Sequence, residues 1–295
     1  MSPAALLDGN AFLEATKAEL RHRLDALSGA GVTAGLGTIL VGDDPNSASY
    51  VARKHRNCEE LGITSFHQAL PATASQEEVQ AAIRRFNEDA AVDAFLVQLP
   101  LPRGLDETAA LLAVDPDKDV DGLHPVNLGR LVMGVDAPLA CTPAGIQALL
   151  VHNGVPIEGR HVVIVGRGLT IGRPLALLLS LKRPHANAAV TVVHTGVSDL
   201  GAHTRQADVL VAAAGMPSLI TPPMVKPGAA VVGAGITWEG KRLLSDVDES
   251  VAEVAGWITP RLGGVGPTTI AMLLSNAVRA AERRRAATGA SAPSA

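Results

Sequence analysis

Tyr50 and Lys54 are the two residues of this sequence that most directly suggest chemistry. Tyr50 is the only tyrosine of the chain, and Lys54 follows one helical turn later in the stretch NSASYVARKHRNCEELGI, residues 46–63. On a helix this spacing places both side chains on one face. A lysine whose ammonium form is disfavoured by burial or by a facing cation can act as a neutral base near pH 7. The pair therefore predicts a proton-transfer site, although a lysine on a helix surface is usually only solvated.

The expected secondary structure puts this pair where α/β proteins bind ligands. The run GLGTILVG, residues 35–42, predicts a strand. The helix that follows has Asp44 as a candidate N-cap, Pro45 at its first position and Gly62 as its C-terminal stop. The pair then lies just beyond the carboxyl end of a strand, which is where open α/β sheets bind their ligands.

Gln98 and Asp121 are expected near the same edge. Gln98 ends a third expected strand in VDAFLVQLPLP, residues 92–102, after a second strand in ITSFH, residues 63–67. Asp121 lies in VDPDKDVDGLHPVN, residues 114–127, which has no helical or strand period and predicts a loop. A glutamine and a tyrosine can orient a lysine by hydrogen bonds. An aspartate in an acidic loop, however, usually only caps or turns the chain.

A glycine loop in the second half of the chain predicts a dinucleotide site. Gly166, Gly168 and Gly172 follow the apolar run HVVIVG and precede a helical stretch, so bare backbone and a helix N-terminus would face a pyrophosphate. A purely structural tight turn is the alternative, since the spacing is one residue longer than the usual fingerprint. The next strand ends in His194 and Thr195 without a carboxylate for a ribose hydroxyl, and Arg167 can face a 2′-phosphate instead. The cofactor predicted from these charges is NADP.

Composition and charge exclude several other classes. A formal net charge of -4 with 18% charged residues offers no basic surface for nucleic acid or anionic membrane, and no apolar run approaches the length of a membrane span. Two cysteines are too few for a disulfide framework, and the charged N-terminal stretch does not resemble a signal peptide, so we expect a cytoplasmic protein. The histidines and cysteines lack zinc spacing, and DPDKDVDG lacks the closing glutamate of a calcium loop, so no metal is expected.

Alternation of short β-rich runs with helical stretches predicts a two-domain α/β protein with mainly parallel sheets. We expect a catalytic domain over 1–140, completed by a C-terminal helix over 267–286 that returns to it. A Rossmann-type nucleotide-binding domain is expected over 141–266. The small polar stretch 287–295 predicts a disordered tail.

Beyond these inferences, the order of motifs resembles a known family, the bifunctional methylenetetrahydrofolate dehydrogenase/methenyltetrahydrofolate cyclohydrolases. The matching blocks are LDG, VGDDPNSASYVARK, VQLPLP, DKDVDG, CTPAG, GRGLTIGRP, ADVLVAAAG, KPGAAVV and GGVGPTTIAMLL, and they span nearly the whole chain. The resemblance implies a homodimer that binds NADP and a folate substrate and belongs to one-carbon metabolism. It also implies oxidation of 5,10-methylenetetrahydrofolate followed by hydrolysis to 10-formyltetrahydrofolate.

Residue roles also follow from the resemblance. It implies catalytic roles for Lys54, Tyr50, Gln98 and Asp121; substrate binding by Tyr50, Gln98, Leu99, Pro100, Asp121, Gly263, Gly264 and Pro267; and cofactor binding by Gly166, Arg167, Gly168, Ile171, Gly172, His194, Thr195, Ala214, Gly215, Gly235 and Ile236.

The sequence departs from the family pattern at a few of these places. PRLGGVGP replaces PVPGGVGP, which puts Arg261 and Leu262 beside the expected folate site. VVGAGI replaces VVDVGI, so Gly233 stands where the family has a carboxylate, and Thr195 replaces a serine. Two alternatives are a non-catalytic folate- or nucleotide-binding relative and an NADP-dependent dehydrogenase of the shikimate type. The intact Tyr50 and Lys54 argue against the first, and the VQLPLP and GGVGPTTIAMLL blocks argue against the second.

Overall fold

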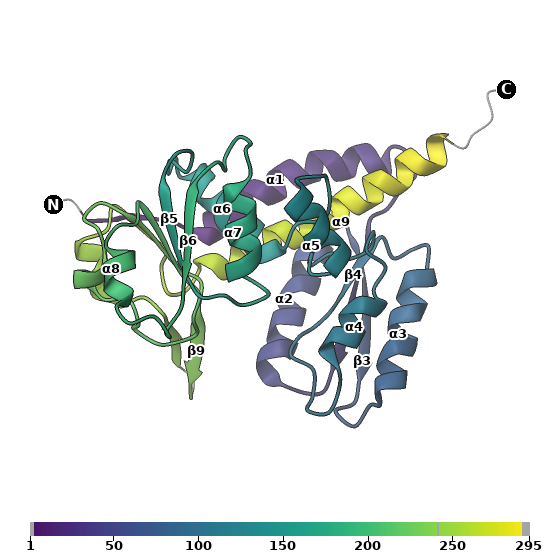
Figure 1. The fold of residues 1–295 in the computed structure, drawn as a ribbon. Helices are drawn as coiled ribbons and strands as arrows, with labels where there is room; N and C mark the ends of the chain where they lie inside the picture. The colour runs from purple at the N-terminus through teal and green to yellow at the C-terminus, as the bar shows by residue number, and fades with distance from the viewer. Residues whose placement is uncertain (1–2, 241, 291–295) are drawn as a thin grey trace. The chain divides into compact units, whose positions relative to one another are not determined.

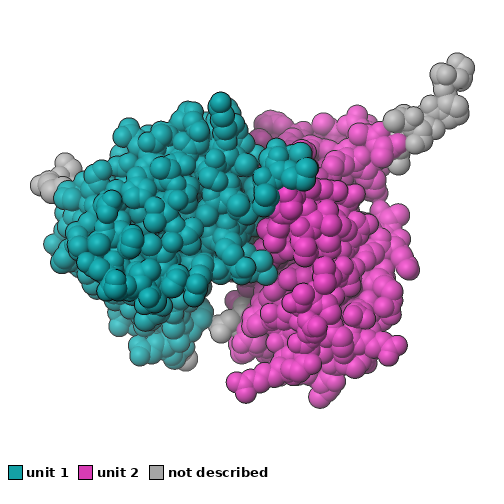
Figure 2. Space-filling view, viewed as in Figure 1, with its two compact units in different colours: residues 1–14, 131–135, 140–272 teal, residues 15–130, 136–139, 273–295 magenta. Residues whose placement is uncertain are grey.

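The computed structural model describes residues 3–240 and 242–290 (Figure 1). The chain divides into two compact units, coloured separately in Figure 2. Unit 1 comprises residues 1–14, 131–135 and 140–272, and unit 2 comprises residues 15–130, 136–139 and 273–295. Within the described residues, no helix combines the length and apolar content of a membrane span.

Unit 2 is built on a three-stranded parallel sheet with the order β3-β2-β4. The strands are β2 (Gly35–Val41), β3 (Thr64–Leu70) and β4 (Ala94–Val97), and the helices that follow them are α2 (Pro45–Leu61), α3 (Gln76–Glu88) and α4 (Glu107–Ala113). All seven residues of β2 are buried, as expected for a central strand that is covered on both faces. Gly37 is required there, because a Cβ would lie 2.8 Å from the ring of Phe86.

The helix that carries Tyr50 and Lys54 begins and ends as the sequence predicts. The Asp44 carboxylate accepts a hydrogen bond from the Ser47 backbone N–H at 2.8 Å. Gly62 takes the left-handed conformation at φ 71° and ends the helix. These local signals fix both ends of α2, so the registers of Tyr50 and Lys54 on its face are fixed as well.

Unit 1 is built on a six-stranded parallel sheet with the order β1-β11-β8-β7-β5-β6. Its strands are β1 (Ala5–Leu6), β5 (His161–Val165), β6 (Ala189–Val193), β7 (Val209–Ala212), β8 (Ala230–Gly233) and β11 (Trp257–Ile258). Helices α6 (Cys141–His152), α7 (Gly172–Ser180) and α8 (Leu200–Thr204) and the 3₁₀ helices η1 (Pro222–Met224) and η2 (Glu249–Glu253) complete it, with an antiparallel hairpin of β9 (Ile236–Glu239) and β10 (Arg242–Ser245). Strands β5 and β6, on either side of the glycine loop and α7 in the chain, were expected from the sequence; β1, β11 and the hairpin were not.

The last helix, α9 (Val265–Ala290), runs beside α1 (Gly9–Ser28) in Figure 1. Arg23 of α1 donates two hydrogen bonds to the Glu282 carboxylate, at 2.9 and 2.7 Å. The Asn276 side chain donates to the backbone carbonyls of Val120 and Leu139. These contacts tie the second half of α9 to unit 2, in agreement with the predicted returning helix. Where the sequence predicted a disordered tail over 287–295, the helix continues to Ala290, and residues 291–295 lie outside the described part. α5 (Pro125–Met133) is the remaining helix.

Candidate active site and nucleotide site

Lys54 is held in a buried polar pocket of unit 2. Lys54 is only 2% exposed, and its Nζ donates a hydrogen bond to Gln98 Oε1 at 3.1 Å. The same Nζ lies 4.6 Å from the centroid of the Tyr50 ring. The structure therefore brings Tyr50, Lys54 and Gln98 together, as their positions in the sequence predicted. Because the lysine is desolvated and directed by two partners, its amine is fixed relative to any ligand that enters the pocket.

The orientation of the Gln98 amide is also fixed. Its Nε2 donates to the Leu99 carbonyl at 2.8 Å, which leaves Oε1 turned toward Lys54. The Gln98 backbone N–H donates to the Ile39 carbonyl at 2.8 Å, so the residue still belongs to the sheet. A cis peptide bond joins Leu99 and Pro100 directly afterwards. Gln98 thus acts as a rigid acceptor at the carboxyl end of β4.

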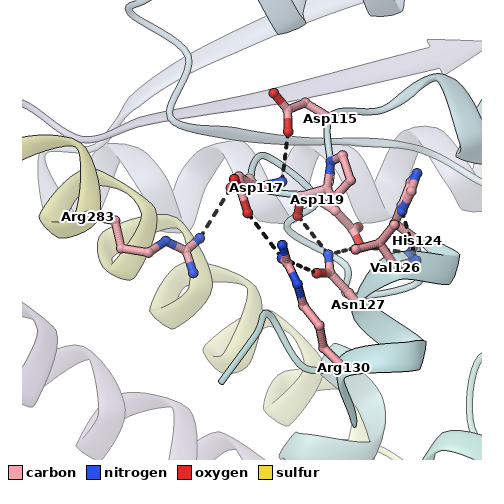
Figure 3. Close-up of polar contacts among 9 residues, drawn as sticks. Asp115, Asp117, Asp119, His124, Val126, Asn127, Arg130 and Arg283 are labelled. Carbon is pink, nitrogen blue, oxygen red and sulfur yellow. Dashed lines mark hydrogen bonds and ion pairs between the residues drawn. The ribbon is translucent and has the colours of Figure 1, made fainter. Parts of the chain in front are cut away.

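The acidic loop that carries Asp121 is organised by its neighbour Asp119 (Figure 3). The buried Asp119 carboxylate accepts hydrogen bonds from the backbone N–H groups of Gly122 and His124 and from the Asn127 side chain, at 3.0, 2.8 and 3.0 Å. Asp119 itself forms a parallel bridge with Phe95 of β4. This network fixes the course of the backbone on either side of Asp121.

Two arginines hold the outer side of the same loop. Arg130 from α5 pairs with the Asp117 carboxylate at 3.1 Å, and Arg283 from α9 donates to the Asp117 carbonyl at 3.2 Å (Figure 3). Asp115 accepts the Asp117 N–H at 2.9 Å. Asp115 and Asp119 therefore turn the chain, which is the ordinary role of aspartates in loops, and the Asp117 side chain ties the loop to α5. Asp121 is not engaged in this way.

Burial raises the pKa of the Asp121 carboxyl above its usual range. The Asp119 charge raises it further, and the Lys54 charge opposes both effects. Because the Lys54 charge lowers the pKa of Asp121, the two side chains are within electrostatic range of each other. A ligand that presents N–H donors to Asp121 would stabilise its charged form and lower the pKa.

Two neighbours of Lys54 on α2 were not expected from the sequence as part of this pocket. Burial, with the charges of His67 and Lys54, lowers the pKa of His55, so this ring next to Lys54 favours its neutral form. Burial raises the pKa of the Cys58 thiol to about 12, which makes it inert rather than nucleophilic. No sequence motif marks either residue, because their environment depends on packing against β3.

The glycine loop of unit 1 fits a dinucleotide phosphate. Gly166 has φ 130°, and a Cβ on it would lie 2.1 Å from the Ala213 carbonyl oxygen. A Cβ on Gly172 would lie 2.2 Å from the Gly166 carbonyl oxygen, so these two glycines are needed for the close turn itself. A Cβ on Gly168, in contrast, would meet no atom within 4 Å. Gly168 thus leaves bare backbone at an open surface, as close approach of a ligand requires.

The start of α7 offers one backbone donor to this surface. Its N-cap, Ile171, makes no side-chain capping hydrogen bond. The Arg173 N–H donates to the Gly168 carbonyl at 3.2 Å and Pro174 has no N–H, so the Gly172 N–H and the positive end of the helix dipole are what α7 offers a phosphate. The residues present therefore fit the pyrophosphate of a dinucleotide.

Arg167, His194 and Thr195 emerge at the same edge of the sheet. Val165 of β5 pairs with Val193 of β6, so the residues that follow these two strands are neighbours at the carboxyl ends. Arg167 and Thr195 are exposed there. His194 Nδ1 accepts a hydrogen bond from the Gly196 N–H at 3.1 Å, which fixes the tautomer with its proton on the other ring nitrogen when the ring is neutral.

Asp246 is the main residue that sequence reasoning missed in unit 1. It is 0% exposed, and its carboxylate accepts hydrogen bonds from three successive backbone N–H groups, those of Ala214, Gly215 and Met216, at 2.6, 2.9 and 2.8 Å. Gly235 packs on the same carboxylate. The predicted cofactor residues Ala214, Gly215 and Gly235 thus surround one buried aspartate. The only sequence signal was an aspartate directly after the apolar run of β10, which lacks any recognisable motif.

Two of the departures from the family pattern, Gly233 and Arg261, have structural explanations. A Cβ on Gly233 would lie 2.6 Å from Ser245 Oγ, so the serine hydroxyl fills the space where a side chain would be. Arg261 donates to the Leu243 carbonyl at 2.8 Å and pairs with Glu249 at 3.1 Å, so it stabilises the β10 region of its own unit. Leu262 is 63% exposed.

The predicted substrate residues of the last motif belong to unit 1. A Cβ on Gly9 would lie 1.8 Å from the Gly264 carbonyl oxygen, and the Gly9 N–H donates to the Gly263 carbonyl at 2.8 Å. Pro267 is buried in the first turn of α9. The motif is therefore a tight packing of backbone on backbone, which explains its glycines without a ligand.

These two sites define the class of protein as a two-domain α/β enzyme with a side-chain active site on one parallel sheet and a nucleotide-binding site on the other. Two family models match the chain: the tetrahydrofolate dehydrogenase/cyclohydrolase catalytic domain over residues 7–121, and its NAD(P)-binding domain over residues 140–285. The chain belongs to the tetrahydrofolate dehydrogenase/cyclohydrolase family, as its motifs predicted, and its activity is that of a bifunctional enzyme of one-carbon metabolism.

Similar proteins come from several organisms. The bifunctional protein FolD of Syntrophotalea carbinolica is 57% identical over 281 residues, which cover 95% of this chain and 97% of that protein. The crystal structure of the FolD methylenetetrahydrofolate dehydrogenase/cyclohydrolase from Campylobacter jejuni aligns with a TM-score of 0.91 at 42% identity, covering 95% of this chain and 99% of that one. The Trypanosoma brucei enzyme, crystallised with NADP cofactor and an inhibitor, aligns with a TM-score of 0.91 at 37% identity, covering 97% and 99%. The shikimate-type dehydrogenase weighed from the sequence gives way to this family membership.

Proposed function

We propose that this chain oxidises 5,10-methylenetetrahydrofolate with NADP⁺ and then hydrolyses the methenyl product to 10-formyltetrahydrofolate. The observation that carries the proposal is the buried Lys54 amine, held between the Gln98 amide and the Tyr50 ring. Hydrolysis requires a proton to be removed from water and another to be given to a nitrogen, and a desolvated lysine can do both.

Lys54 belongs to the hydrolytic step in this proposal. The methenyl substrate is a cation, and a like charge beside Lys54 favours the neutral amine, which can take the proton from water. Gln98 Oε1 accepts a hydrogen bond from the lysine and holds its Nζ in place. Lys54 Nζ covers one face of the Tyr50 ring, and the opposite face is proposed to stack on the pterin.

Asp121 is proposed to bind the pterin edge. That edge presents adjacent N–H donors, which suit one carboxylate better than an amide. Substrate binding would then return the carboxyl, whose pKa burial raises, to its charged form. Leu99 and Pro100 follow Gln98 and would line the same pocket. Gly263, Gly264 and Pro267 are proposed to bind substrate, as the family resemblance implies.

NADP is the proposed cofactor, and when bound it accepts the hydride. Gly168 and the start of α7 are proposed to receive its pyrophosphate, and the exposed Arg167 its 2′-phosphate. Ile171, His194, Thr195, Ala214, Gly215, Gly235 and Ile236 are proposed to line the rest of the site. A homodimer and a cytoplasmic location remain predictions from the sequence.

The test mixes the purified protein with 5,10-methylenetetrahydrofolate and either NADP⁺ or NAD⁺, and follows reduced cofactor and methenyl absorbance together. Reduced NADP without lasting methenyl absorbance is the expected result, because both steps then run. Accumulated methenyl would contradict the hydrolytic role of the Lys54 pocket. Equal rates with NAD⁺ would contradict the NADP assignment, and no reduction of either cofactor would contradict the proposal as a whole.

A further inference from the structure

We propose that Asp246 is a positioning residue for the dinucleotide: it holds the loop after β7 in the shape that receives the cofactor, without touching the cofactor itself. The inference rests on the proposed dinucleotide site and goes beyond it, because it assigns a role to a buried carboxylate outside every motif used to recognise that site.

Both oxygens of the Asp246 carboxylate accept hydrogen bonds from the loop after β7. Oδ2 accepts from the N–H groups of Ala214 and Gly215, and Oδ1 accepts from that of Met216. Successive backbone N–H groups that converge in this way form an anion-binding nest. Here the nest is filled by the protein's own anion, so these N–H groups are not offered to a phosphate. The phosphate donors must therefore come from the glycine loop and α7.

The same residue also joins a second loop to the first. The Asp246 backbone N–H donates to the Gly235 carbonyl at 3.1 Å, and a Cβ on Gly235 would lie 2.0 Å from Oδ2. The Ala234 and Gly235 N–H groups both donate to the Ala212 carbonyl, at 2.8 and 2.9 Å. The turns after β7 and β8 are thus locked together around one carboxylate.

The locked loop packs directly on the glycine loop. Ala212 of β7 pairs with Val165 of β5, and the Ala213 N–H donates to the Val165 carbonyl at 2.7 Å. The Ala213 carbonyl oxygen occupies the space where Gly166 would carry a Cβ. A displacement of residues 214–216 would therefore be transmitted to Gly166, one residue away from Arg167.

Asp246→Asn is the main test because it keeps the shape of the side chain and replaces one of the two acceptor oxygens by an NH₂ group. One amide nitrogen would then face a backbone N–H, so at least one of the three hydrogen bonds is lost. We expect the dissociation constant for NADP⁺, measured by calorimetry, to rise about tenfold to a hundredfold, since a loop that must order on binding weakens affinity. The value of kcat at saturating NADP⁺ should change much less than KM. Hydrolysis of added 5,10-methenyltetrahydrofolate, which uses the Lys54 pocket, should stay close to the wild-type rate.

Hydrogen exchange supplies a readout that needs no cofactor. In the folded variant without ligand, the amides of residues 214–216 should exchange faster than in the wild type, while those of the buried strand β5 should not. Asp106→Asn is the matched control, since the Asp106 carboxylate likewise accepts a backbone hydrogen bond, from the Ala109 N–H of α4, and lies in unit 2. Gly235→Ala should reproduce the Asp246→Asn result, because its Cβ would displace the carboxylate.

Unchanged NADP⁺ affinity and unchanged exchange at 214–216 in Asp246→Asn would overturn the inference, and so would equal loss of the hydrolytic activity, which indicates a general structural role. Either result leaves the proposed function intact, because that is judged on the wild type. A wild-type protein that binds no dinucleotide would instead overturn the proposed function and this inference with it.

Discussion

The two candidate sites are built by opposite means. The pocket in unit 2 consists of side chains whose polar ends are buried and paired, such as Lys54 with Gln98. The site in unit 1 consists of backbone without side chains, at the glycines Gly166, Gly168 and Gly172. The first kind of site is sensitive to the loss of one functional group, and the second to the addition of one carbon atom. In unit 2, removing one functional group should therefore lower activity more than stability. In unit 1, adding one carbon atom should lower either stability or ligand affinity, depending on the glycine that is changed.

The largest effect is expected from Lys54→Met, which keeps the length of the side chain and removes the amine. Cyclohydrolase activity should fall about a hundredfold to ten-thousandfold, the range of general acid–base catalysis. Binding of a folate ligand, measured by fluorescence or calorimetry, should persist. Lys182→Met, at an exposed lysine of unit 1, is the control and should leave both quantities unchanged. Hydrolysis at the wild-type rate by Lys54→Met would refute the assigned role.

Two matched alanine substitutions in the glycine loop test whether the site in unit 1 depends on the absence of side chains. Gly166→Ala forces a Cβ against the Ala213 carbonyl at a positive φ and should lower the free energy of unfolding by about 3 kcal/mol or more. Gly168→Ala adds the same atom in open space, so its unfolding free energy should change by less than about 1 kcal/mol.

The same two substitutions distinguish the effect of a Cβ on packing within the protein from its effect on ligand binding. Gly168→Ala should raise KM for the dinucleotide about tenfold while the hydrolytic step is unaffected, because the added carbon meets the ligand rather than the protein. Denaturant unfolding and steady-state kinetics measure the two effects. If Gly168→Ala left the dinucleotide KM unchanged, the loop would be a structural turn only.

Arg167→Ala tests whether the cofactor is NADP rather than NAD. Loss of a cation that pairs with a 2′-phosphate should raise KM for NADP⁺ about tenfold to a hundredfold and leave KM for NAD⁺ nearly unchanged. Arg160→Ala is the control, since that exposed arginine precedes β5 at the opposite end of the strand. Equal losses for both cofactors would contradict the NADP prediction.

The smallest effect is expected from the ionisation of Asp121. Its pKa is raised in the folded protein, mainly by burial, so the folded state keeps this proton at pH values where the unfolded state has lost it. The unfolding free energy of the wild type relative to Asp121→Asn should therefore fall as pH rises from the ordinary aspartate range, about 4, through the raised pKa. Denaturant titrations at several pH values measure this slope. A difference that grows with pH would show the opposite shift.

Much of the candidate active site in unit 2 could be predicted because its signals are local. Asp44 and Gly62 bound α2 by hydrogen bonds within a few residues, and the helical period then fixes Tyr50 and Lys54 on one face. The strand that ends in Gln98 is a continuous apolar run. The glycine loop is equally local, since the strand, turn and helix that form it are adjacent in the chain.

Other features depend on partners far away in the sequence. The two-residue strands β1 and β11 pair Leu6 with Ile258, and neither run is long enough to be recognised alone. The predicted tail began too early because Arg284, which donates to the Thr33 and Ala90 carbonyls, ties α9 to unit 2 close to its end. The β9–β10 hairpin was missed as well, although it places Ser245 beside Gly233.

Local signals are enough to predict the α/β class, the order of the motifs and the residues that could do chemistry, because periodicity, caps and glycine turns act over a few neighbouring positions. The burial of Lys54, the raised pKa of Asp121 and the hydrogen bonds of Asp246 to the loop after β7 become visible only in the folded chain. Desolvation and long-range hydrogen bonds produce these properties, and both arise only when residues distant in the chain are packed together.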